Sequence, residues 1–543
     1  MAPDRSERPP GKVILRNPLR GLRYSTLGLM VLIIAGILYV LTERTRGGDS
    51  GPPLASLETG EGVAQRALNL DVKRTRRGLP SLKVSAKEAL TYRDGSTTLH
   101  DVAVTVIGED RKTTEITAPV AVSGAGSSGG WSFKNGVELK DDEGFRVEVP
   151  EIDYHETPQE LSATGSVSFS TGAIEGTARG LRYLVGRRII EFPADVEIRT
   201  AAGSDPSRKI LSESARFDPR SHQIEFRRYR TLSSDGETLS GTSLLVDIEE
   251  VDGRKVIRSL HSTQGFRAYL PGPAPPGGGA GGPGRLLTGD ALDLSLDPSG
   301  RIDAASARGG VRLTDGDPNQ DPRTISCNHL EAALDQGAIT SITASGSAHL
   351  RIPARQDPQG EMTTLGADRL VARFAPGGRS LQRVEAETGV IATHGDRTLK
   401  APHVAWETAS GLWTLRGEGD LQASVTSPSG SISADSVDLD RPHEVLDAHG
   451  HVRTAYLEKE PGGDAAAAGA SPPGADGAKR MAGLLGSGDG PLHAMSDALH
   501  LVLPDRKAHY TGNVRIWRGG GSIEAATVDY SDADGLLEAR DHV

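Results

Sequence analysis

The C-terminal segment GNVRIWRGGGSIEAATVDYS, residues 512–531, decides the expected fold of this chain. Apolar Val514 and Ile516 alternate with polar residues, and a second alternating run begins at Ile523, after the glycine-rich stretch RGGG. Strict alternation is typical of a β-strand that buries one face, because successive side chains point to opposite sides of a sheet. The segment therefore predicts two neighbouring strands joined by a turn.

The same pattern recurs along the chain as a repeat. Its first half is G-x-h-x-h, where h marks a position expected to face inward. The copies begin at Gly165, Gly265, Gly309, Gly346, Gly419, Gly450 and Gly512, with a poorer copy at Gly389. The second half recurs in ISCNHLEAAL from Ile325, LGADRLVARF from Leu365, LKAPHVAWET from Leu399, ISADSVDLD from Ile432 and IEAATVDYS from Ile523. One such unit cannot bury its apolar face alone, so the repeat predicts stacked strand pairs, with the glycine at a bulge or bend.

The composition also favours strands over helices. Of 543 residues, 36% are hydrophobic and only 4% aromatic, whereas 67 are glycine and 32 are proline. This mix suits many short strands joined by turns, and the length predicts roughly two to four domains. The net charge of −11 lacks the basic footprint of a general nucleic-acid-binding protein, so we expect no nucleic-acid partner. The single cysteine, Cys327, can form no disulfide within the chain and is expected to be a half-buried strand residue.

One segment departs from the strand pattern and predicts a membrane anchor. Residues 24–42 carry no charge, and their centre, Leu27–Leu41, is LGLMVLIIAGILYVL. The segment is close to the roughly 20 residues that a membrane-spanning helix needs. Residues 1–23 contain six basic side chains against two acidic ones, so the positive-inside rule places this tail in the cytoplasm. No A-x-A site of a cleaved signal peptide follows, and we expect the helix to be retained.

Composition also divides the rest of the chain into segments. Residues 43–62 are rich in glycine, proline and acidic residues and are expected to form a tether, and a first β-domain is expected at 63–270. A Gly/Pro linker is predicted at 271–285, followed by a second β-domain at 286–543 with a low-complexity insertion at about 460–490. Alternating strands of the first domain are predicted at Val84–Tyr92, Thr98–Ile107, Glu115–Ser123 and Phe145–Tyr154.

No stretch of the sequence predicts catalysis. Gly124–Gly129 matches a dinucleotide fingerprint and Gly126–Gly130 a nucleophile elbow, but both motifs need a following helix, and a strand-like run follows instead. His443, His449 and His451 lack the spacing of a zinc-binding helix and are interpreted as turn histidines. We therefore expect no enzyme activity, no cofactor and no metal site.

The order of these motifs resembles two families. Residues from about 62 to 200 resemble the LptC family, the membrane-anchored periplasmic component of lipopolysaccharide export, in VSAKEALTY, EITAPVAV, WSFKNGVEL, FRVEVPEIDYHETPQELSATGSVSF and IEGTARGLRYLVGRRIIEFPADVEI. Residues from about 285 to 543 resemble the LptA/OstA-like repeat family, most clearly at 512–543. LptC proteins typically end after one domain, so the second, LptA-like half is a departure from that family.

The resemblance implies an all-β protein in which an N-terminal transmembrane helix precedes curved antiparallel β-jellyrolls. It implies a non-catalytic, single-pass inner-membrane component with a periplasmic body, which passes lipid along an apolar groove toward the outer membrane. The implied partners are lipopolysaccharide or a related glycolipid, an inner-membrane ABC transporter that supplies the energy, and other β-jellyroll bridge proteins added at an edge strand. The residues expected to contact lipid are Val167, Phe169, Val311, Leu313, Leu350, Val514 and Ile516, whereas Ser168, Arg312 and Arg515 are expected to face away.

Two other functions remain open at this point. A membrane-anchored β-solenoid scaffold or adhesin stalk would show the same repeats but would have a filled interior. An envelope polysaccharide lyase built on a β-helix would need basic and acidic residues clustered on one face, and the repeats align no such cluster. An open interior would therefore favour lipid conveyance, and a filled interior would favour the scaffold.

Overall fold

The computed structural model describes the chain from residue 62 to residue 541, apart from short interruptions. The described ranges are 62–76, 79–107, 112–124, 130–142, 144–155, 159–171, 174–185, 187–200, 207–218, 220–251, 254–271, 284–316, 321–356, 360–378, 380–456, 490–505, 507–531 and 536–541. The expected cytoplasmic tail, the anchor at 24–42, the tether up to residue 61, most of the Gly/Pro linker and the insertion up to residue 489 lie outside these ranges. No helix among the described residues is both long and apolar enough to cross a membrane.

The chain divides into two compact units, Met1–Val63 and Ala64–Val543, and the second unit is all-β. Its strands up to the expected linker are β1 (Val63–Arg76), β2 (Leu79–Tyr92), β3 (Thr97–Ile107), β4 (Thr113–Ser123), β5 (Gly130–Asp141), β6 (Phe145–His155), β7 (Glu160–Thr171), β8 (Ile174–Leu184), β9 (Ile189–Phe192), β10 (Ala194–Thr200), β11 (Arg208–Asp218), β12 (Gln223–Ser233), β13 (Thr238–Val251) and β14 (Arg254–Leu270). The strands that follow are β15 (Arg285–Gly289), β16 (Ala291–Leu296), β17 (Ile302–Asp315), β18 (Arg323–Asp335), β19 (Ala338–Ile352), β20 (Thr363–Phe374), β21 (Leu381–His394), β22 (Arg397–Glu407), β23 (Leu412–Arg416), β24 (Ala423–Ser427), β25 (Gly430–Ala434), β26 (Ser436–Asp440), β27 (Val445–Tyr456), β28 (Leu492–Val502), β29 (Lys507–Arg518), β30 (Gly521–Ser531) and β31 (Leu536–Arg540). A short 3-10 turn, η3 (Ala354–Gln356), follows β19.

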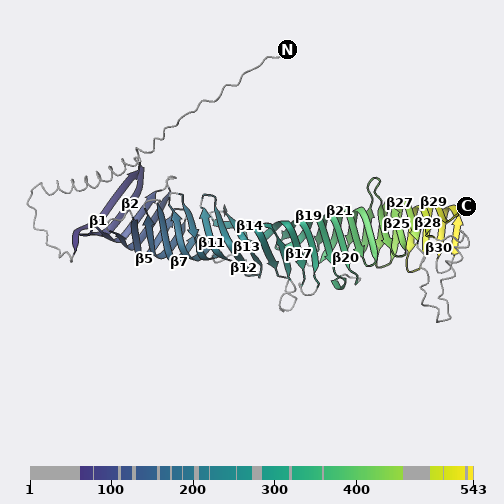
Figure 1. The fold of residues 1–543 in the computed structure, drawn as a ribbon, viewed down its shortest axis with the longest axis horizontal. Helices are drawn as coiled ribbons and strands as arrows, with labels where there is room; N and C mark the ends of the chain where they lie inside the picture. The colour runs from purple at the N-terminus through teal and green to yellow at the C-terminus, as the bar shows by residue number, and fades with distance from the viewer. Residues whose placement is uncertain are drawn as a thin grey trace, which may run out of the picture. The chain divides into compact units, whose positions relative to one another are not determined.

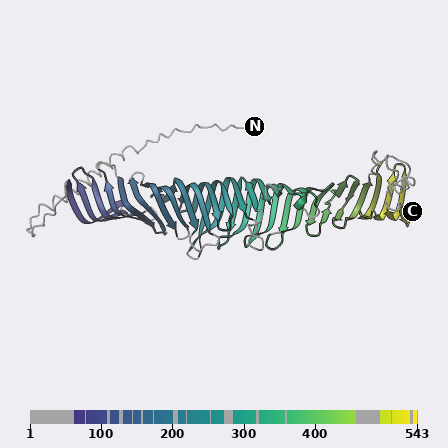
Figure 2. The ribbon, with the colours of Figure 1, turned by 90° about the horizontal axis from the view of Figure 1, so that it is seen from below.

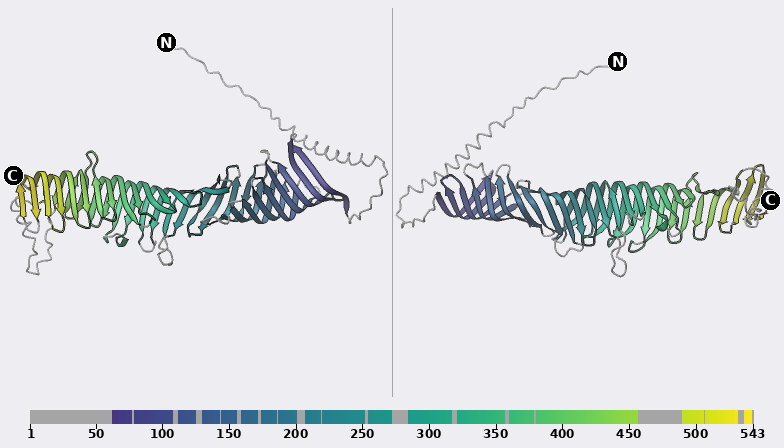
Figure 3. Two further views of the ribbon diagram at one scale, coloured as in Figure 1. Left: turned by 180° about the vertical axis from the view of Figure 1, so that it is seen from behind. Right: turned by 60° about the horizontal axis from the view of Figure 1, so that its bottom comes forward.

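From β2 to β31 the strand pairs of the described residues are antiparallel, and most strands pair with the strands next to them in the chain, so the unit is one ladder (Figure 1). Four positions in the ladder are occupied by two short strands in place of one long strand: β9 with β10, β15 with β16, β23 with β24, and β25 with β26. Views from other directions show the same strand order along the ladder (Figures 2 and 3). Short turns between sequential strands favour this topology, because antiparallel strands need no long crossover.

Most strands contain a bulge near the middle, and the line of bulges divides the ladder lengthwise. In β17 the pairing register shifts between Arg308 and Val311, and neighbouring strands shift at the equivalent point. A bulge adds one unpaired residue, bends its strand and increases the local twist. We call this line the crease. The strand halves that align through the pairing with Val311–Asp315 form the first wall. The halves that align with Ile302–Arg308 form the second wall. The side opposite the crease, where the strand ends and turns of both walls lie, is the mouth.

Most of the repeat glycines lie at the crease, as the sequence predicts. Six of them have a positive φ within or beside a strand: Gly265, Gly309, Gly346, Gly389, Gly450 and Gly512. Glycine adopts this conformation without steric cost. At Gly309 and Gly512 an added Cβ would also overlap an aspartate side chain of the neighbouring strand. The predicted bend is therefore confirmed at these six positions.

Two copies of the repeat differ from this arrangement. Gly165 lies at the register shift of β7 but has no positive φ. Gly419 has a positive φ but lies in the turn between β23 and β24, where Leu421 is 66% exposed. The expectation that Leu421 faces inward is wrong, because a split in the strand at this point replaces the bulge with a turn.

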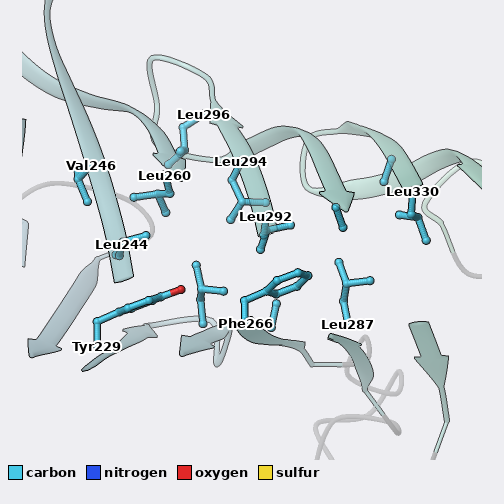
Figure 4. Close-up of a cluster of buried hydrophobic side chains, with 14 of the residues drawn as sticks. Tyr229, Leu244, Val246, Leu260, Phe266, Leu287, Leu292, Leu294, Leu296 and Leu330 are labelled. Carbon is cyan, nitrogen blue, oxygen red and sulfur yellow. The ribbon is translucent and has the colours of Figure 1, made fainter. Parts of the chain in front are cut away.

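The hydrophobic core fills the space between the two walls. Buried side chains from Ala86 to Ala508 form one continuous apolar cluster. Figure 4 shows its centre, where Tyr229, Phe266 and Leu287 of the first wall face Leu292 and Leu294 of the second wall. Hydrogen bonds also cross between the walls, from Tyr229 to Ser262 (2.6 Å) and between the hydroxyls of Thr454 and Tyr510 (3.2 Å).

The predicted strands of the first half are confirmed, since all four lie within β2, β3, β4 and β6. The ladder continues past the expected linker, because β14 pairs directly with β15 and β16. The strands of both expected domains, 63–270 and 286–543, therefore belong to a single ladder. The division into two domains stays a prediction. Cys327 lies on β18, as expected for a strand residue, but is only 6% exposed, so it is buried more deeply than predicted.

Candidate lipid-binding groove

The seven residues predicted to contact lipid all lie on the inner face of the first wall. Their exposed fractions are 0% for Val167, 6% for Phe169, 1% for Val311, 7% for Leu313, 6% for Leu350, 1% for Val514 and 2% for Ile516. Ser168, Arg312 and Arg515 are exposed on the opposite face. The inward and outward positions therefore follow the predicted alternation, whereas contact with lipid stays a prediction.

The residues predicted from the sequence belong to the first wall only, and none belongs to the second. The second wall places Leu260, Leu292, Leu330 and Ile342 opposite the first, each less than 4% exposed. The second phrase of the repeat contains the signal for this wall, since Leu330 and Ala332 alternate past the crease. The bulge breaks their alternation with Ile325 and Cys327 and moves the buried positions by one residue.

Aromatic side chains fill the groove at two places. In the first half of the ladder, Phe169 of β7 stacks on Phe192 of β9, with ring centroids 4.3 Å apart. Further along, Trp406 and Trp413 stack at 4.9 Å, and the ring of His394 lies 6.0 Å from Trp413. Large rings bury much apolar area. The Phe169–Phe192 and His394–Trp413 contacts join the two walls, whereas Trp406 and Trp413 are neighbours on β22 and β23 of the second wall. The groove is therefore packed at both of these points.

Between the two aromatic regions the packing is incomplete. A cavity of about 70 Å³ is lined mainly by leucine, isoleucine and alanine side chains of β13 to β19, together with polar groups that include Arg208, Glu237 and Arg285, and a second cavity of about 40 Å³ extends toward β21. The two cavities share Arg285, Leu313 and Ile342. An apolar cavity of about 150 Å³ stays dry and accepts benzene, so these spaces suit only short hydrocarbon segments. A full acyl chain would pass only if the walls moved apart.

Four arginines bridge the two walls at the mouth, and we call them the mouth arginines. Arg208 donates to the carbonyl of Gly300 (3.2 Å), and Arg285 donates to the carbonyl of Gly378 (2.8 Å). The remaining two pair with carboxylates, Arg188 with Asp141 (3.1 Å) and Arg441 with Glu361 (2.5 Å). The partners are 47 to 93 residues apart in the chain. Opening the groove would require these contacts to break.

Burial shapes the electrostatics of these bridges. The side chains of Arg188 and Asp141 are 5% and 4% exposed, so neither charge is well solvated if the other is lost. Burial raises the pKa of Glu237, and the Arg208 guanidinium 3.3 Å away only partly opposes this shift. Arg285 also lies 5.5 Å above the ring of Phe374, which adds a cation–π contact beside the cavity.

The structure also assembles a serine, a histidine and two aspartates on the outer face of the second wall. His261 Nδ1 lies 2.9 Å from Asp293, while its Nε2 lies 2.8 Å from Asp247 and 2.9 Å from Ser259 Oγ. Burial alone lowers the pKa of His261, but the hydrogen bonds to Asp293 and Asp247 outweigh it, and the net pKa is raised. Carboxylates on both ring nitrogens favour the protonated form of His261, and that form is poorly suited to act as a general base for Ser259.

The three histidines noted in the sequence do not converge. His443 bonds Asp440 (2.9 Å) in a turn, while His451 bonds Asp435 (2.8 Å) from β27. The interpretation of all three as turn residues is wrong for His449 and His451, because β27 begins at Val445. Among the described residues, no three histidine, cysteine or carboxylate side chains are placed to hold a metal ion.

Comparisons with known proteins give little further identification. No protein-family model matches the chain, and no curated protein matches it. Among solved structures, the chain is similar to LptH from Pseudomonas aeruginosa, described as the LptA-homologous periplasmic component of the conserved lipopolysaccharide transport device. The identity is 15%, the match covers 25% of this chain and 82% of that one, and the TM-score is 0.20. A likeness at this level carries no weight for function.

Proposed function

We propose that this protein is a non-catalytic conveyor of an amphiphilic lipid, held at a membrane by its N-terminal segment. The acyl chains would travel between the two walls, and the polar part of the lipid would remain at the mouth. The resemblance of the sequence to LptC and LptA/OstA-like proteins supports lipopolysaccharide or a related glycolipid as the cargo. The energy would come from a partner ABC transporter, because lipid movement along a passive groove needs an external source.

One observation carries this proposal: a single buried apolar cluster extends along most of the ladder. It reaches from Ala86 on β2 to Ala508 on β29, and a second, smaller cluster that includes Val514 and Ile516 follows it at β28 to β30. In the middle of this surface the cavities beside Leu313 leave space that side chains do not fill. A fully optimised structural core has few such voids, because interiors are close-packed.

Photocrosslinking tests the proposal directly. A photoreactive residue is placed at Leu313 or Leu330, which line the larger cavity, and at their outward neighbours Thr314 and Glu331 as matched controls. With lipopolysaccharide supplied in cells, we expect labelled lipid at the two inner positions only. Equal labelling of inner and outer positions, or labelling of neither pair, would contradict a lipid-conveying groove.

A structural scaffold is the second candidate function, and one observation favours it. The seven predicted lipid contacts are at most 7% exposed, and aromatic rings close the groove at two points. A scaffold would keep this packed state permanently. Under this alternative the photoreactive residue at Leu313 would label protein from the facing wall and no lipid, in every condition tested.

We also propose that residues 24–42 form a single-pass anchor in the inner membrane, with the N-terminus in the cytoplasm. The uncharged stretch and the basic tail before it support this topology. A reporter enzyme that is active only in the periplasm should be active when fused after residue 60. Activity of a cytoplasmic reporter at the same position would reverse the proposed topology.

The last strand suggests how partners would join. Within the described residues β31 pairs only with β30, and Leu536 on it is 50% exposed. An unpaired strand edge can accept a strand from another β-protein. We propose that a further β-jellyroll protein adds here. Proline in place of Glu538 removes one backbone donor and should weaken copurification with that partner, while unchanged copurification would exclude pairing at this edge.

A further inference from the structure

The outer face of the first wall carries a cross-strand row of positions in which basic side chains recur. The register places Arg267 opposite Thr288, Thr288 opposite Arg312, and Arg312 opposite Ser326, and the row continues through each strand to β29. Its permanently charged members are exposed and all positive: Arg230, Arg267, Arg312, Lys400, Arg453 and Arg515. We call them the basic row. Beyond these strands the row meets carboxylates, Glu197 on β10 and Glu524 on β30.

Most of these cations have no carboxylate partner. Arg515 lies 3.5 Å from Glu524, but the other five make no ion pair within the described part of the chain. Two acids at the crease are engaged by other side chains, since Asp435 accepts from His451 (2.8 Å) and Asp497 accepts from Asn513 (3.0 Å). The basic row therefore presents free positive charge on a protein whose net charge is −11.

Other outer surfaces of the ladder pair their charges. In the first half of the same wall, Glu138 contacts both Lys140 (2.9 Å) and Arg146 (2.5 Å). On the second wall, Arg383 contacts Glu407 (2.5 Å) and Glu385 (2.8 Å). A row of one sign is thus confined to the first wall from β12 to β29. Unpaired like charges in line raise the local potential and attract anions.

Toward the mouth the row is flanked mainly by neutral hydroxyl groups, with Tyr269 on β14 near one end and Trp517 on β29, over whose ring Arg515 lies at 5.9 Å, at the other. The next outward row toward the mouth is dominated by threonine: Thr314, Thr324, Thr364, Thr393, Thr398 and Thr426. These hydroxyls can donate to and accept from the hydroxyl groups of sugars. The basic row itself contains no phenylalanine, tyrosine or tryptophan between β12 and β29, so it lacks the series of stacked rings that single-stranded nucleic acids use.

We propose that the outer face of the first wall binds a linear acidic polysaccharide laid along the basic row. Successive basic members, with His349 between Arg312 and Lys400, are two or three strands apart. At about 4.8 Å per strand this spacing is about 10–14 Å, a regular series that suits a polymer with repeating anionic groups. A charged line one residue wide fits a chain better than a membrane surface. This face lies opposite the groove, so the proposal is independent of lipid conveyance.

Binding of fluorescent heparin, a linear sulfated polysaccharide, by the full-length protein in neutral detergent tests the proposal. The test variant carries Arg267→Thr, Arg312→Thr and Lys400→Thr, and threonine suits a strand. The control carries Arg369→Thr, Arg383→Thr and Arg416→Thr on the second wall, with the same loss of charge. We expect the test variant to bind about tenfold more weakly, because each exposed charge contact contributes a factor of about two, and the control to stay within about twofold.

Several outcomes would overturn the proposal. Equal weakening in both variants would show that only net charge matters, and no weakening in either would exclude the row as the site. Tighter binding of single-stranded DNA, or of vesicles with anionic lipid, than of heparin would assign the face to another partner class. If the triple variant does not fold, the single changes at Arg267, Arg312 and Lys400 replace it, each with an expected loss of about twofold.

Discussion

Filling the central cavity tests whether the space between the walls exists in solution. Ala332 on β18 lies opposite Ala305 on β17, and both line the cavity of about 70 Å³. Empty volume costs about 24 cal/mol per Å³, so filling this cavity recovers at most about 2 kcal/mol. Ala332→Leu should therefore be neutral or stabilising. Ala448→Leu is the matched control, because Ala448 is fully buried and lines neither cavity, so the larger side chain costs about 1–3 kcal/mol.

Amide hydrogen exchange is the suitable assay, because a stacked ladder opens in segments rather than all at once. In Ala332→Leu the protected amides of β17 to β19 should exchange at the original rate or more slowly, whereas in Ala448→Leu those of β26 to β28 should exchange faster. Faster exchange around Ala332, by as much as around Ala448, would refute the cavity. As a second readout, lipid crosslinking from Leu313 should fall in Ala332→Leu if the groove conveys lipid.

Three further predictions concern buried and titrating groups. Arg188→Ala removes the cation beside the buried Asp141 carboxylate and should cost about 3–5 kcal/mol in urea denaturation, whereas Arg182→Ala, at an exposed ion pair, should cost less than about 1 kcal/mol. The pKa of His261 is raised above 6.5 and the pKa values of its two aspartates are lowered below 3.8. The stability that the charged histidine contributes is lost as pH rises through its folded-state pKa, and the stability that the aspartates contribute is lost as pH falls through theirs. Exchange protection of β13 to β16 should therefore be greatest between about pH 4 and 6.5. The variant His261→Gln should remove the loss of protection on the alkaline side. Burial raises the pKa of Cys327 to about 11, so the native thiol should resist maleimide at pH 8 and react only after unfolding; rapid native labelling would show that β18 is not buried.

The local pattern of the sequence was sufficient for the strands and for the direction of their side chains. Alternation around Leu313 and Leu350 predicts the buried face, because in a strand the side-chain period is two whatever the strand pairs with. Glycine at positions such as Gly309 predicts the bend, since a positive φ is a local backbone property. The copy at Gly419 failed because glycine also suits a turn, and the short pattern does not separate the two uses.

Other features could not be predicted from the sequence, because they depend on the register between strands. The basic row exists only because Arg267, Arg312 and Lys400 come to equivalent positions on β14, β17 and β22. Their spacing in the sequence is irregular, since turns and loops of different length separate the strands. The cluster around His261 likewise combines residues of β13, β14 and β16. Neither feature forms a motif that a linear pattern could identify.

The sequence by itself determined an all-β ladder with one apolar face, a crease at its glycines and an expected anchor at residues 24–42. Only the tertiary structure decided how the two walls face each other, where aromatic rings close the groove, and where cavities remain. The mouth arginines, whose partners lie 47 to 93 residues away, belong to this second group. The physical reason is that alternation and backbone conformation depend on neighbouring residues, whereas packing between walls depends on the summed lengths of bulges and turns over many strands.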